Sequence, residues 1–159
     1  MMTPETINKV LETKGNVTAR DVHGESVDIN HAIGLHFTHP TKQWRLNAIL
    51  HVQFGVYEAE IPVGYIWNGA DIPRLCWSLI GVNPHDRRVL IASCVHDWGC
   101  ENENVPQKLA DGMFASLLEP ITFNGYPLPG VGKTRAALMY YAVRTWSVRN
   151  VAKNWEKGT

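Results

Sequence analysis

Three ionisable side chains stand among apolar residues in the second half of the chain, and their types suit chemistry. His96 and Asp97 are adjacent in the run SCVHDWGC, residues 93–100, and Asp111 lies in the run LADGMF, residues 109–114. Burying such groups costs several kcal/mol unless they pair with each other or bind a metal ion. Because proteins usually accept this cost at a site, we expect these three residues to form one.

The spacing of the three residues predicts separate roles for them. Neighbours on a helix point about 100° apart, so His96 and Asp97 face different surroundings. His96 needs an acid from elsewhere to fix its tautomer, and Asp111 on the next helix is the best candidate. We therefore predict a hydrogen bond between His96 and Asp111 across two packed antiparallel helices. These two residues are the candidate catalytic pair.

A shaped loop precedes the helix that carries His96. Two prolines and two glycines within residues 62–74 rule out a regular strand or helix there. We expect the stretch from Gly64 to Pro73 to pack against the helix of His96 and to face Asp97. The residues that shape this loop are Pro62, Gly64, Gly69, Pro73 and Arg74.

The same loop offers oxygen ligands for a metal ion. Asp97, Asp71 and Asn68, together with backbone carbonyls, would form a set of hard oxygen ligands, which favours calcium over zinc. A simpler interpretation is open for two of them. Asp71 suits the N-cap of the helix that follows, and Asn68 with Gly69 suits a plain turn.

Two stretches resemble the active-site helices of secreted phospholipases A₂ of the bacterial and fungal type. Residues 94–102, CVHDWGCEN, are similar to their Cys-x-x-His-Asp-Phe-Gly-Tyr-Arg-Asn pattern, and residues 109–114 are similar to their next helix. The resemblance implies that His96 is the general base for a water molecule, that Asp111 orients it, and that Asp97 is a calcium ligand.

A longer resemblance, over about residues 44–146, is to a phage and prophage family of domains of unknown function. That family has a V-P-x-G-F-x-x-D-x-A-S-I-P-R loop, a V-H-D helix and an A-D-x-x-F helix. Here the corresponding segments are IPVGYIWNGADIPR (61–74), VHD (95–97), ADGMF (110–114) and MYYAVR (139–144). Asn68 stands where the family has aspartate, and Asp71 where it has serine. The resemblance implies a phage- or prophage-encoded protein.

Composition limits the classes of protein that this chain can represent. Its 159 residues suffice for one domain with a core, and fifteen basic residues balance fifteen acidic ones. Because the charges balance, the sequence gives no reason to expect nucleic acid as a partner. The three cysteines predict buried free thiols made in a reducing compartment. We expect no signal peptide and no transmembrane segment, synthesis in the host cytoplasm, and a place in the virion or the host cell.

The elements expected around the site form a single α+β domain. A helix over residues 3–14 and a strand-rich part lead to a hairpin that starts at Trp44 and ends at Ile61. The loop of residues 62–74 and a helical part over residues 75–155 follow. A helix from residue 84 or 85 to residue 99 is apolar nearly all round, which is typical of a central helix. We expect a small antiparallel sheet packed on three to four helices, with this helix at the centre.

Three functions fit these features. The first is a hydrolase-like His–Asp site in a phage protein that is a component of the virion or tail. Its partners would be other phage structural proteins or a membrane surface. The second is a purely structural or binding module, in which His96 and Asp111 only hold the core together. The third is a metal-dependent phosphohydrolase, which needs two further ligand positions.

Overall fold

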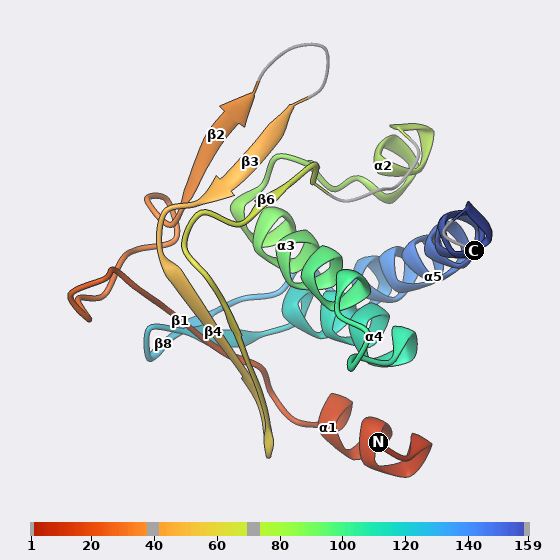
Figure 1. Cartoon of the computed structure of the whole chain (residues 1–159), viewed down its shortest axis with the longest axis horizontal. Coiled ribbons are helices and arrows are strands. Elements are labelled where there is room, and N and C mark those ends of the chain that lie inside the picture. Colours follow the sequence, from red (N-terminus) through yellow and green to blue (C-terminus); the bar gives the residue numbers. More distant parts are fainter. Residues whose placement is uncertain (1, 38–41, 70–73, 158–159) are drawn as a thin grey trace.

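The computed structural model of the chain describes residues 2–37, 42–69 and 74–157. Within these ranges it contains five helices and two sheets, which confirms the predicted mixture of helices and strands (Figure 1). The helices are α1 (Pro4–Glu12), α2 (Arg74–Ile80), α3 (Arg87–Glu101), α4 (Gln107–Leu118) and α5 (Lys133–Lys157).

The strands divide into a five-stranded and a three-stranded sheet. The first has the order β5-β4-β1-β7-β8 and the second the order β2-β3-β6. Their bounds are β1 (Asn16–Arg20), β2 (Ile33–Phe37), β3 (Gln43–Leu46), β4 (Ile49–Phe54), β5 (Tyr57–Ile61), β6 (Ile66–Trp67), β7 (Ile121–Phe123) and β8 (Tyr126–Leu128). In the larger sheet β1 is central, antiparallel to β4 and parallel to β7.

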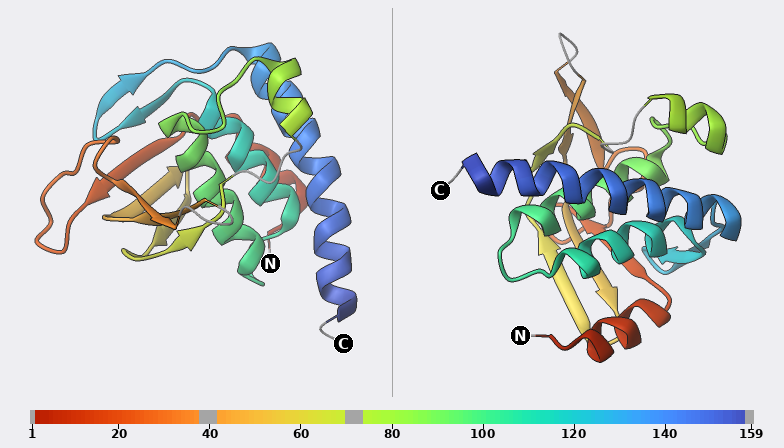
Figure 2. Two further views of the ribbon diagram at one scale, coloured as in Figure 1. Left: turned by 90° about the horizontal axis from the view of Figure 1, so that it is seen from above. Right: turned by 90° about the vertical axis from the view of Figure 1, so that its right-hand side faces the viewer.

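The helices form layers on one side of the sheets. Helices α3 and α4 lie next to each other, and α5 packs on α4 from the outer side (Figure 2). Alternate residues of β4, namely Leu50, Val52 and Phe54, are fully buried and belong to the same core as the apolar residues of α3 and α4. Helix α3 is thus covered on several sides, as its apolar sequence predicts.

The predicted hairpin is present as β4 and β5, joined at Gly55 and Val56, but its first strand is divided. The prediction that the hairpin starts at Trp44 was wrong, because Trp44 lies in β3, which pairs with β2 and β6, while β4 pairs with β1 and β5. The backbone changes partners at this break: the Leu46 N–H donates to the Tyr65 carbonyl and the Asn47 N–H to the Ala32 carbonyl.

Helix α3 begins at Arg87, two to three residues later than the sequence pattern predicts. The Asp86 carboxylate accepts a hydrogen bond from the Arg88 N–H at 2.8 Å and acts as the N-cap. His85 instead lies in a turn in which its N–H donates to the Asn83 side chain. The cap therefore sets the start of the helix that carries the site.

Arg88 fixes the start of α3 to the end of α4. Its guanidinium donates to the carbonyls of Leu117 at 2.6 Å, Glu119 at 2.6 Å and Pro129 at 2.6 Å. The carbonyls at a helix end lack partners within the helix, so a forked cation satisfies several of them at once.

The variant Arg88→Lys is expected to lower the free energy of unfolding by about 1–3 kcal/mol, because an ammonium group cannot reach three divergent carbonyls. Urea denaturation followed by circular dichroism measures the change. The control is Arg45→Lys, at an exposed position of β3, which should shift the value by less than about 0.5 kcal/mol. Equal effects of the two variants would contradict the bridging role of Arg88.

Candidate functional site

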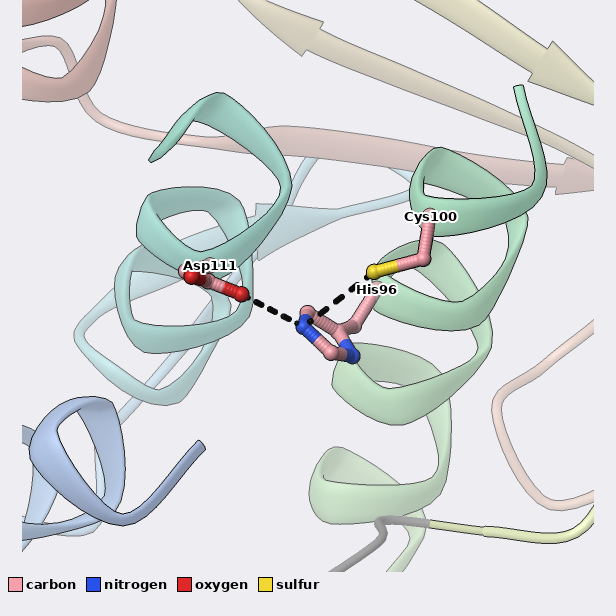
Figure 3. A group of neighbouring side chains, drawn as sticks. All are labelled: His96, Cys100 and Asp111. Carbon is pink, nitrogen blue, oxygen red and sulfur yellow. Dashed lines mark hydrogen bonds and ion pairs between the residues drawn. The ribbon is translucent and has the colours of Figure 1, made fainter. Parts of the chain in front are cut away.

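The centre of the candidate site is a hydrogen bond between α3 and α4. His96 Nε2 lies 2.7 Å from Asp111 Oδ1, as the sequence predicts (Figure 3). Gly99 permits the close approach of the two helices, since a Cβ added there would lie 3.0 Å from Ala110 Cβ. Asp111 is 0% exposed and His96 is 6% exposed, so both groups are removed from solvent.

A third helix joins this pair through Arg144 of α5. The guanidinium donates from Nη1 to Asp111 Oδ2 at 3.0 Å, while Oδ1 of the same carboxylate faces His96. One buried carboxylate therefore links side chains of α3, α4 and α5. In the sequence, Arg144 stood out only as the last residue of the segment MYYAVR (139–144), and its contact with Asp111 was not predicted. The Arg144 side chain is 41% exposed and the register of α5 is set by tertiary packing, so the sequence carried no signal for this contact.

Cys100 is the second site residue that the sequence analysis missed. Its Sγ lies 3.6 Å from His96 Nε2, and the side chain is half-buried instead of fully buried as predicted. The two residues are four positions apart on α3, a spacing that places them on one face of a helix. Ligand atoms of His96, Cys100 and Asp111 all lie within 4.8 Å of one another (Figure 3).

Asp97 lies on the other edge of the imidazole ring. Its Oδ1 is 3.6 Å from His96 Nδ1, and its side chain is 27% exposed, far more than that of Asp111. The two nitrogens of His96 therefore face two different acids, one buried and one in partial contact with solvent.

The described part of the preceding loop packs on α3, as predicted. The Trp67 indole N–H donates to Ser93 Oγ at 3.1 Å, and the Tyr65 hydroxyl donates to Glu101 Oε2 at 3.0 Å. Burial raises the pKa of Tyr65, and the charges of Glu101 and Asp97 raise it further. This side of α3 therefore carries two acids, Asp97 and Glu101, close to Tyr65 of the loop.

The other predicted loop residues fall into two groups. Gly64 and Gly69 have positive φ values of 89° and 86°, a conformation that glycine adopts without strain and that supports their loop-shaping role. Pro62 is exposed, and so is Asn68, whose amide oxygen accepts a hydrogen bond from Gln43 Nε2 at 3.2 Å. Asp71, Pro73 and the side chain of Arg74 lie outside the described residues.

The surroundings of His96 favour its charged form. Burial alone would lower the pKa, but hydrogen bonds to Asp111, Asp97 and Cys100 outweigh it and raise the pKa from 6.5 to about 11. The imidazole is therefore protonated at neutral pH in this state. It acts as a donor to Asp111, not as a base.

An α+β domain with a buried His–Asp pair between two helices is thus the class that the structure defines. The chain belongs to the family described as "Protein of unknown function (DUF1353)", whose members match it over residues 44–143. The uncharacterized protein y4jT of Sinorhizobium fredii is 33% identical over 86 residues, which is 54% of this chain and 23% of that protein. The chain thus spans less than a quarter of that relative's length. No solved structure matches it.

Membrane insertion through a helix finds no support in the described residues. Among them, no helix is both long enough and apolar enough to cross a bilayer.

Proposed function

We propose that the protein is encoded by a phage or prophage and carries a hydrolase-like site centred on His96. The main support is that the two nitrogens of the His96 imidazole lie next to two different acids. Nε2 is held by the buried Asp111, whereas the Nδ1 edge faces the part-exposed Asp97. A histidine oriented by a buried acid, with its other nitrogen directed toward an accessible side, is the arrangement that activates a water molecule.

In this proposal His96 takes a proton from water at Nδ1, and Asp111 holds the ring and stabilises the resulting charge. The substrate is an ester, as the resemblance to phospholipases A₂ implies. Arg144 supplies a positive partner for Oδ2 of the same carboxylate. The proton that His96 carries at neutral pH must leave before the ring can act as a base.

Calcium is the cofactor that we propose for Asp97. Its partly exposed carboxylate fits one of the six to eight oxygen positions that calcium takes. Asn68 would have to give up its bond from Gln43, and Asp71 lies outside the described residues. When bound at Asp97, calcium would polarise the ester carbonyl and offset the carboxylate charge that helps to hold the His96 proton.

The test is hydrolysis of phospholipid vesicles and soluble aryl esters by the purified protein, with calcium or with a chelator. The variant His96→Gln should lose about 10²–10⁴-fold in rate, since a positioned base contributes that much. The control is His51→Gln, because His51 also lies near an acid, 3.8 Å from Glu58, but on the sheet. Background rates in all proteins and conditions would reject the hydrolase.

We also propose that the protein works in the virion or tail, with other phage structural proteins as partners. The support is the motif order shared with the phage and prophage family. Mass spectrometry of purified particles from the encoding phage would detect the protein at a fixed copy number. Its absence from such particles would restrict it to the host cell.

A second candidate, a structural role for the same residues, has its own support. The Asp111 carboxylate joins three helices, and His96 and Arg144 together provide two positive partners for it. A purely structural protein would still bind its partner proteins but would show no hydrolysis. The third candidate, a phosphohydrolase, requires further metal ligands beyond His96 and Asp97, and it stays a prediction.

A further inference from the structure

The three polar atoms between α3 and α4 converge on one point. Asp111 Oδ1 and Cys100 Sγ both approach the same nitrogen, His96 Nε2, at 2.7 Å and 3.6 Å. In a Cys–His–Asp relay the thiol and the acid contact opposite nitrogens of the ring, so that a proton can pass through it. This cluster therefore does not form such a relay. Atoms that converge on a common point are instead the arrangement of ligands around a metal ion.

We propose that His96, Cys100 and Asp111 bind one divalent cation of the Zn²⁺ class. Zinc bonds to nitrogen, oxygen and sulfur are about 2.0–2.3 Å long, so ligand atoms around a tetrahedral zinc lie roughly 3.3–3.6 Å apart. The Sγ–Nε2 separation of 3.6 Å already has this value. The Nε2–Oδ1 separation of 2.7 Å must open by roughly half an ångström, a side-chain movement.

The chemistry of the three ligands selects the metal. Imidazole and thiolate favour zinc and similar ions, whereas calcium and magnesium prefer oxygen ligands alone. Charge also balances: one dication enters as two protons leave, one from the Cys100 thiol and one from the His96 ring. Burial of the ion therefore adds no net charge. Three protein ligands leave a fourth tetrahedral position for water, which is typical of reactive zinc sites.

Two neighbouring side chains support such a site. Arg144 donates to Asp111 Oδ2 and so leaves Oδ1 directed at the cluster, as outer partners of metal ligands do. Gln107 lies one turn before Asp111 on α4, and its buried Nε2 has no hydrogen-bond partner among the described residues. A hydroxide formed from the metal-bound water would offer an acceptor to a donor on this face.

The zinc site does not depend on the proposed hydrolysis and would in fact compete with it. A cation on Nε2 replaces the hydrogen bond by which Asp111 orients His96. Zinc is therefore expected to inhibit the hydrolysis that calcium supports, so the two ions would have opposite effects on one histidine.

Cobalt substitution tests the site without any assay of activity. The full-length protein, freed of metal with a chelator, is titrated with Co²⁺ and its absorption spectrum recorded. We expect one equivalent to produce tetrahedral cobalt bands and a thiolate-to-cobalt charge-transfer band, and Zn²⁺ to abolish both. In Cys100→Ala the charge-transfer band should vanish and the affinity fall by at least about 10–100-fold. The control is Cys94→Ala, on the same helix but outside the cluster, which should keep the band.

Alkylation of the unmodified chain provides a second readout if Cys100→Ala fails to fold. Mass spectrometry should show that Zn²⁺ slows the reaction of Cys100 with iodoacetamide. No charge-transfer band in the unmodified protein, a band that persists in Cys100→Ala, or alkylation of Cys100 at the same rate with and without zinc would each overturn the proposal.

Discussion

Replacing Asp111 by alanine is expected to lower the free energy of unfolding by about 3–5 kcal/mol, the range measured when one partner of a buried ion pair is removed. Asp111 is completely buried and accepts from His96 at 2.7 Å and from Arg144 at 3.0 Å. Its loss leaves the His96 imidazolium inside the protein without its main acceptor. Urea denaturation followed by tryptophan fluorescence gives the value directly.

The control for this variant is Glu5→Ala, which removes an exposed ion pair. Glu5 lies 3.0 Å from Lys9 on α1, and both side chains are largely in solvent. Such pairs contribute less than about 1 kcal/mol. If Asp111→Ala costs no more than Glu5→Ala, then Asp111 does not hold the three helices together. That result would also remove the structural interpretation of the site.

Stability should fall steeply between pH 7 and pH 11 because of His96. Its pKa in the folded protein is about 11, compared with 6.5 for an ordinary histidine. A group whose pKa is raised by folding stabilises the protein fully below the unfolded pKa, and this contribution disappears as the pH rises through the folded value. The free energy that His96 adds is therefore present at pH 6 and largely lost at pH 11.

The comparison that isolates this effect is between the unmodified protein and His96→Gln. The difference in their unfolding free energies should shrink as the pH rises, because ionising tyrosines affect both proteins alike. The ring protons of His96 in NMR spectra should also show no titration near pH 6.5. A normal titration there, or a difference that does not change with pH, would show that the imidazole is not held in its charged form.

The His96–Asp111 contact could be predicted because the sequence shows two ionisable residues that would be buried without a partner if they did not meet. Two ionisable residues in apolar helical runs must meet, and antiparallel packing of consecutive helices is the simplest way for them to do so. Arg144 could not be found in this way, because its helix is separated from α4 by a strand pair and its register is set by tertiary packing. Cys100 was visible in principle, since the spacing His96-x-x-x-Cys100 places both side chains on one helix face.

The division of the sheets was harder to predict than the helices. No glycine or proline separates β3 from β4, so the local pattern gives no sign that the chain changes sheets at Asn47. The β7–β8 hairpin, in contrast, has a signal that was overlooked. Asn124 and Gly125 both have positive φ and join two short strands, which is the preferred pair for a two-residue turn. The Asn124 side chain then accepts from the Ala19 N–H and ties this hairpin to β1.

Strand β1 joins the two halves of the larger sheet, since it lies between β4 and β7. It also precedes residue 44, where the match to the family begins. The shared segment alone would contain two separate strand pairs whose inner edges expose unpaired N–H and C=O groups. The matched segment therefore lacks the strand that joins the two halves of the larger sheet.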